Sequence, residues 1–204
     1  MNYANIKKTD VANGPGIRVS LFVSGCTHRC RGCFNSEAWD FRYGREYTRE
    51  TEEEILRALA PDYIRGLSVL GGEPMEPENR GTVLTLLKAV RRQYPQKDIW
   101  CYTGYDYEKD LLVWAGEGSY GGTESPAEGV TETVDGVTDR DEAASDCAAD
   151  RTVRELLDCI DVLVDGEFME ERKNLRLAFR GSENQRLIDV KKSLQAGRTV
   201  CLPE

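Results

Sequence analysis

Residues 17–33 read IRVSLFVSGCTHRCRGC, a largely apolar segment followed almost directly by three cysteines. The apolar part, 17–23, has glycine and proline before it and a glycine soon after it, which predicts a buried strand. In parallel α/β folds, functional sites form at the carboxyl ends of the strands. The cysteine loop that follows this strand is therefore the first candidate for a site.

Outward from this stretch, short apolar segments alternate with helical patterns. Further strands are predicted at 66–70, 99–103, 161–164 and 187–190. Helices are predicted where Thr51 and Glu54 have capping-box spacing, as far as Pro61, and again from Pro77. The chain of 204 residues is shorter than the roughly 250 of a full eight-stranded barrel. We therefore predict an α/β fold: a partial, open (β/α) barrel with a mostly parallel sheet of about five strands.

The acidity of the chain belongs to one segment. Residues 116–150 hold ten acidic residues against Arg140 alone, which equals the net charge of −9 of the whole chain. The rest is balanced and shows no basic surface typical of nucleic-acid binding. We expect a single domain over 1–204, with a flexible acidic insertion at 116–150.

Neither a secretory signal nor an apolar run long enough to span a bilayer is evident in the sequence. A cytoplasmic location without membrane contact is therefore expected. In that compartment free or metal-bound thiols are more common than disulfides.

Cys26, Cys30 and Cys33 lie within eight residues, and three thiolates at this spacing can bind one metal ion or cluster. A disulfide would leave an odd thiol. Zinc bound by the three cysteines and His28 stays open, although His28 lies between two of the cysteines, where closure on the same ion is sterically awkward. His28 is otherwise expected to be a solvated loop residue or a donor to a cluster sulfur, rather than a general base.

The cysteine spacing, followed one βα unit later by Gly71-Gly72-Glu73-Pro74, resembles the radical S-adenosylmethionine superfamily. The resemblance implies that Cys26, Cys30 and Cys33 ligate three irons of a [4Fe–4S] cluster, whose fourth iron is open to S-adenosylmethionine. It implies contacts to that molecule from the residues that match the family's motifs: Gly32, Cys33 and Phe34 near the adenine, Gly72 and Glu73 at the methionine end, and Thr103 and Asp165 as further polar contacts. Leu70 and Arg31 depart from the residues frequent in relatives, which are Ser and Pro.

Within that superfamily, the segments 13–18, 22–26, 32–35, 102–105, 163–168 and 180–186 are similar to the activating proteins of anaerobic ribonucleoside-triphosphate reductases. This resemblance implies an oxidoreductase that cleaves S-adenosylmethionine reductively, forms a 5′-deoxyadenosyl radical and generates a glycyl radical on the reductase. No side chain acts as the catalyst in such chemistry. The electron would come from a reduced flavodoxin-type donor.

Two groups of alternatives remain. The nearer is an activase of another glycyl-radical enzyme such as pyruvate formate-lyase, whose activases have Asp where this chain has Asn13, or a small-molecule radical S-adenosylmethionine enzyme such as a deazaguanine synthase. The more remote is a binding module for zinc or a passive iron–sulfur cluster. Cys101, Cys159 and Cys201 are expected to be small core residues, while Cys147 in the acidic segment has no evident role.

Overall fold

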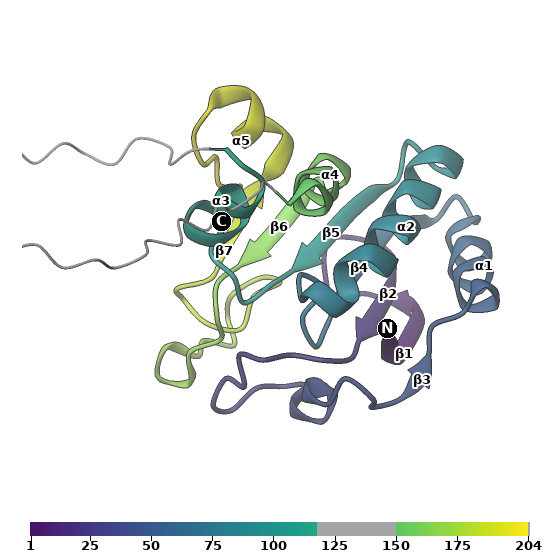
Figure 1. The fold of residues 1–204 in the computed structure, drawn as a ribbon, viewed down its shortest axis with the longest axis horizontal. Coiled ribbons are helices and arrows are strands. Elements are labelled where there is room, and N and C mark those ends of the chain that lie inside the picture. The colour runs from purple at the N-terminus through teal and green to yellow at the C-terminus, as the bar shows by residue number, and fades with distance from the viewer. Residues whose placement is uncertain (118–149, 204) are drawn as a thin grey trace, which may run out of the picture.

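An open sheet in the order β3-β1-β2-β4-β5-β6-β7 forms the centre of the molecule (Figure 1). The computed structural model describes residues 1–117 and 150–203, so most of the predicted insertion at 116–150, with Cys147, lies outside the described residues. The strands are β1 (Asn2–Asp10), β2 (Ile17–Val23), β3 (Arg45–Glu46), β4 (Ile64–Gly71), β5 (Asp98–Tyr102), β6 (Val162–Asp165) and β7 (Arg186–Asp189).

The pairing confirms an α/β fold with an open, partly parallel sheet. Strands β2, β4, β5 and β6 are parallel neighbours, whereas β1, β3 and β7 pair antiparallel at the two sides. The expected number of about five strands was too low, because the described part of the chain has seven. Strand β1 was missed because its sequence, NYANIKKTD, is mostly polar and half of it faces solvent. Strand β3 has two residues, too few to leave a periodic pattern.

Helices cover one face of this sheet: α1 (Arg49–Leu59), α2 (Pro77–Gln93), α4 (Arg151–Cys159) and, near the last strand, α5 (Val190–Ala196). The capping box of α1 lies three residues earlier than predicted: Thr48 and Thr51 form it, instead of Thr51 and Glu54. The hydroxyl of Thr51 can do what a glutamate does in this motif, since it reaches back to the backbone N–H of Thr48. Pro77 occupies the first turn of α2 as predicted. In the described residues no helix is both long enough and apolar enough to cross a membrane.

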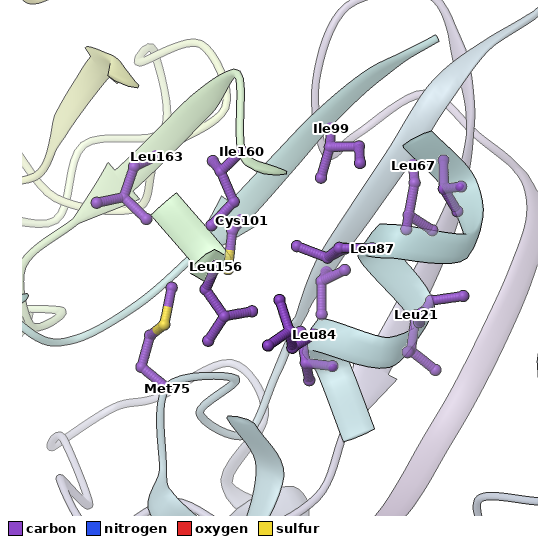
Figure 2. Packing of buried hydrophobic residues seen from close by; sticks show 14 of the residues in the cluster. Leu21, Leu67, Met75, Leu84, Leu87, Ile99, Cys101, Leu156, Ile160 and Leu163 are labelled. Carbon is purple, nitrogen blue, oxygen red and sulfur yellow. The ribbon is translucent and has the colours of Figure 1, made fainter. Parts of the chain in front are cut away.

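The main core lies between the sheet and these helices. Alternate strand residues face it, for example Leu21, Leu67 and Ile99, and they pack against Leu87 of α2 and Leu156 of α4 (Figure 2). Cys101 is fully buried in this cluster, so its prediction as a small core residue is confirmed. Cys159 is partly buried against the cluster, whereas Cys201 is exposed, so the prediction was wrong for Cys201.

The strand side chains between the core positions point to the opposite face of the sheet. Arg18, Ser20, Ser68, Trp100 and Tyr102 come from positions between the core residues of β2, β4 and β5. This face is polar and aromatic, and it is not part of the main core. It therefore leaves room for a site, with the cysteine loop at its carboxyl edge.

Candidate functional site

A cavity of about 630 Å³ lies on this second face and opens at the carboxyl edge of the parallel strands. The residues that line it come from the loops after β1, β2, β4, β5 and β6, and from the sheet itself at Lys7, Phe22, Leu70 and Tyr102. Cavities that take small molecules commonly measure about 300–1,000 Å³. The cavity is therefore large enough for a sizeable organic ligand.

Cys26, Cys30 and Cys33 all line this cavity, and each is a free, half-buried thiol. The backbone N–H groups of Gly25 and Cys26 donate to the carbonyl oxygens of Ala38 and Trp39, which anchors the start of the loop. Gly25 has a φ of +95°, and a Cβ atom there would lie 2.2 Å from the ring of Phe41. The loop can turn back over the cavity only because this residue is glycine.

The arrangement of the three sulfurs does not suit a single ion. Among residues 1–117 and 150–203, three possible metal-binding atoms all lie within 4.8 Å of one another in the acidic group of Asp106, Glu108 and Asp165. The sulfur atoms of the three cysteines are not all within that distance of one another. Tetrahedral zinc, with Zn–S bonds of about 2.3 Å, would hold its sulfurs roughly 3.8 Å apart. At least one pair of the cysteine sulfurs is therefore more widely separated than on a single zinc ion, which is compatible with a polynuclear iron–sulfur cluster.

Burial raises the pKa of Cys26 to about 11, with the nearby carboxylate of Glu73 adding to the shift. Burial also raises the pKa of Cys30. Metal ligation requires thiolates, so the positive charge that would stabilise them has to come from the bound metal. These cysteines are therefore poor free nucleophiles and better suited to be ligands.

The Gly71-Gly72 pair joins the end of β4 to the cysteine loop. The N–H of Gly72 donates to the carbonyl of Val23 at 2.7 Å, and the N–H of Glu73 donates to the carbonyl of Gly25 at 2.8 Å. A Cβ atom on Gly72 would lie 2.5 Å from the carbonyl oxygen of Gly25. The second glycine is therefore needed for a close backbone contact between two loops of the site.

The Glu73 carboxylate is 1% exposed and connects three loops. It accepts hydrogen bonds from the N–H of Met75 at 2.8 Å and from the N–H of Gly104 at 2.7 Å. The ring nitrogen Nε2 of His28 lies 3.4 Å from it, an ion-pair distance rather than an aligned hydrogen bond. The side chain thus fixes the loops after β4 and β5 against the cysteine loop while it lines the cavity.

His28 is not a solvated loop residue, because only 10% of its side chain is exposed. Its Nδ1 lies 2.8 Å from Glu167, and its ring packs edge-on against Tyr105 with 4.4 Å between the centroids. The nearby carboxylate of Glu73, opposed by burial and supported by Glu167, raises the pKa of His28 to about 9. Sequence reasoning missed this pairing because Glu73 and Glu167 are far from His28 along the chain.

The other expected site residues divide into two groups. Phe34 and Thr103 line the cavity, and Phe34 packs against Phe168 with 5.2 Å between the ring centroids. Gly32, with a φ of +71°, lies in the turn before Cys33 and is not among the lining residues.

Asp165 belongs to the second group and faces a neighbouring cavity of about 360 Å³. Its carboxylate is bound by the guanidinium of Arg186, with Nε at 3.0 Å from Oδ1, and it also accepts from the N–H of Tyr107. The structure therefore brings the three cysteines, Phe34, Gly72, Glu73 and Thr103 around one cavity and leaves Asp165 outside it.

Several lining residues were not expected from the sequence. They are Lys7, Asn13, Tyr102, Phe168, Leu175 and Phe179. Tyr102 could have been found from the strand alternation with buried Cys101. The others lie on β1 or in loops whose sequences carry no periodic signal, so only the fold could place them.

Comparison with known proteins identifies relatives over most of the chain. The family model described as "4Fe-4S single cluster domain" matches residues 12–116 and 135–188. A protein of Vibrio cholerae serotype O1 is 38% identical over 187 residues, which cover 91% of this chain and 96% of the relative. Proteins of Enterobacteria phage T4 and Escherichia coli K12 are 34% and 32% identical over 187 residues, covering 92% and 91% of this chain and 93% and 96% of theirs. All three carry the name anaerobic ribonucleoside-triphosphate reductase-activating protein, and the present chain belongs to that family of iron–sulfur proteins.

Proposed function

We propose that this chain is a radical S-adenosylmethionine enzyme that generates a glycyl radical on an anaerobic ribonucleoside-triphosphate reductase. The observation that carries the proposal is that one cavity is lined by Cys26, Cys30 and Cys33 together with Gly72 and Glu73. The names of the relatives supply the partner, and the family model supplies the 4Fe–4S cluster.

Different residues would bind the cluster and the two ends of S-adenosylmethionine. Cys26, Cys30 and Cys33 would hold three irons of a [4Fe–4S] cluster, because three thiolates leave one iron open to a reactant. The backbone at Gly72 would receive the methionine end of S-adenosylmethionine, since a residue without a side chain permits close approach. Cys33 and Phe34 would contact the adenine, with Gly32 shaping the turn before them.

Thr103 would contribute a further polar contact in the same cavity. Asp165, paired with Arg186, would act on the site through the position of the loop after β6 rather than by touching the ligand. Glu73 would orient the loops, because both of its carboxylate oxygens already accept backbone hydrogen bonds.

When bound, the cluster, reduced by one electron, and S-adenosylmethionine would together supply methionine and a 5′-deoxyadenosyl radical. That radical would remove a hydrogen atom from a glycine of the partner. The protein would position these molecules and exclude water and oxygen, with the rings of Phe34 and Phe168 at the edge of the cavity. The proposal includes a reduced flavodoxin-type protein as the electron donor and a cytoplasmic location. It also includes a single domain over 1–204 with an acidic insertion at 116–150, and a sheet that curves as a partial, open barrel.

The experiment is anaerobic reconstitution with iron and sulfide, followed by reduction in the presence of S-adenosylmethionine and the reductase. We expect 5′-deoxyadenosine and a glycyl-radical signal in electron paramagnetic resonance. Cys30→Ala should lose both, whereas the matched variant Cys159→Ala, whose thiol does not line the cavity, should keep both.

Two results would separate the alternatives. A radical formed on pyruvate formate-lyase but not on the reductase would move the chain to another activase function. Bound zinc, or a cluster that is indifferent to S-adenosylmethionine, would overturn the radical mechanism.

A further inference from the structure

The loop after β6, residues 166–185, borders the opening of the main cavity. Leu175 of this loop lines the cavity and is 83% exposed, so its side chain lies at the opening. In the described part of the chain no other large apolar residue is as exposed. Phe34 of the cysteine loop also lines the cavity and is 61% exposed. Large apolar side chains are therefore presented to solvent at the opening of the proposed active site.

The loop after β6 packs directly against the cysteine loop, and both extend from the same end of the parallel strands (Figure 1). The ring centroids of Phe34 and Phe168 are 5.2 Å apart, and Nζ of Lys173 lies 4.9 Å from the centroid of the Phe34 ring. A Cβ atom on Gly181 would lie 3.0 Å from the ring of Phe168 and 3.1 Å from that of Phe34. Glycine at this position therefore lets the two rings and the returning chain meet. We call Phe34, Phe168 and Leu175, which all line the opening, the apolar rim.

The segment 180–186 fixes the loop that carries Leu175. Oε1 of Gln185 accepts hydrogen bonds from the N–H groups of Gly181 at 2.9 Å and Ser182 at 3.2 Å, and its Nε2 donates to the carbonyl of Gly166 at 3.0 Å. The N–H of Asn174, the residue before Leu175, donates to the carbonyl of Gly181 at 3.2 Å. One glutamine thus joins the two ends of the loop, and the backbone next to Leu175 is tied to the same segment.

A leucine held in this way does not gain the stabilisation that burial of its side chain would give. Fixed apolar groups that remain exposed at the edge of a cavity are typical of a surface that a partner covers. Because the hydrogen bonds already order the loop, a partner that covers it loses little additional conformational entropy. The arrangement therefore favours docking of another molecule on the apolar rim.

The position of the rim identifies its partner. The proposed function, on which this inference rests, requires a glycine of the reductase to reach the cavity, so the polypeptide around that glycine has to cross the opening. A second copy of this chain seated on the same residues would close the opening to the reductase. The surface that covers the rim during the reaction is therefore the reductase itself.

We propose that the apolar rim is a docking surface for the reductase and that Leu175 is its main anchor, which packs into an apolar pocket of the reductase beside the reacting glycine. Anchors of protein interfaces are commonly single large side chains that become fully buried in a pocket of the partner. In this proposal Leu175 takes no part in the radical chemistry, and its contribution is affinity for the protein substrate.

The test measures binding of the full-length reductase to the reconstituted enzyme with S-adenosylmethionine, by calorimetry under anaerobic conditions. Leu175→Ser should weaken binding about 10- to 100-fold, which corresponds to the loss of one buried leucine side chain. Leu175→Met keeps an apolar side chain of similar volume and should bind within about 3-fold of the wild type.

Two controls separate docking from damage to the fold. Because Leu175 is exposed, Leu175→Ser should keep the wild-type melting temperature and iron content. Tyr63→Ser is the matched surface change: it removes a side chain that is 64% exposed, just before β4 and thus at the other end of the strands, and should leave the affinity for the reductase unchanged.

Wild-type affinity in Leu175→Ser would overturn the inference. It would also be overturned if this substitution dissociated, in sedimentation of the enzyme alone, a dimer that the wild type forms, because a second copy of the chain would then cover the rim. In both cases the proposed function stands as long as the wild-type enzyme forms a glycyl radical on the reductase. If the wild type forms no such radical, the proposed function fails, and the inference fails with it.

Discussion

Replacement of Gly72 by alanine tests whether the contact between β4 and the cysteine loop builds the site. The added Cβ atom would lie 2.5 Å from the carbonyl oxygen of Gly25 and 2.9 Å from that of Ala38. Real Cβ atoms essentially never approach other heavy atoms closer than 3.0 Å. Both neighbours are backbone atoms, so no side-chain rotation can relieve the clash, and one of the two loops has to move.

Forcing an extra carbon into packed surroundings typically costs about 1–3 kcal/mol. In a chain of this length each kcal/mol lowers the melting temperature by roughly 2–4 °C, so Gly72→Ala should melt roughly 2–12 °C below the wild type. Gly81→Ala is the matched control. Gly81 lies in α2, where an added Cβ atom would have no other atom within 4 Å, and alanine should stabilise that helix by roughly 0.5–1 kcal/mol.

The assay has two stages. Thermal and urea unfolding of the metal-free proteins gives the stability change, and iron and sulfide content after anaerobic reconstitution then reports whether the cysteines still assemble a cluster. We expect lower stability and less cluster for Gly72→Ala, and full cluster with slightly higher stability for Gly81→Ala. Wild-type stability together with a full cluster in Gly72→Ala would refute the argument that this backbone contact shapes the loop.

Three further changes test other parts of the structure. Arg18→Leu should destabilise the protein by about 1–3 kcal/mol in urea unfolding, because the buried carbonyl of Leu67 loses its hydrogen bond from the guanidinium. Asp98 loses one of its two arginine partners and keeps the other, Arg65. Burial works to raise the pKa of Glu108, but the hydrogen bonds from Arg186 and Thr199 and the charge of Arg186 together outweigh it and lower the pKa to about 2. The stability that the ionised Glu108 contributes is complete above its unfolded pKa of about 4.3 and should be lost as the pH falls toward 2. Glu108→Gln should therefore be less stable at neutral pH and show a flatter loss of stability between pH 5 and 3. Glu73→Gln should lower stability by about 1–3 kcal/mol, since the amide NH₂ cannot accept one of the two backbone hydrogen bonds.

Much of the fold could be predicted because its strands and helices are periodic. The strands at β2, β4, β5 and β6 were each expected within a few residues, since buried apolar runs between glycines and prolines are local signals. Strands β1 and β3 were not, because β1 is polar and partly solvated and β3 has only two residues. The same reason explains why Lys7, on β1, was not expected in the cavity wall.

The candidate site divides in a similar way. The sequence by itself offered Cys26, Cys30 and Cys33 as candidate ligands through their spacing, and the Gly72 turn through the family resemblance, because both features lie in continuous segments that carry their own chemistry. Only the tertiary structure decided that Asp165 pairs with Arg186 outside the cavity, and that Asp10 holds the amide of Asn13. Side-chain pairing of this kind depends on which segments the sheet brings side by side, and the order of residues along the chain does not contain that information.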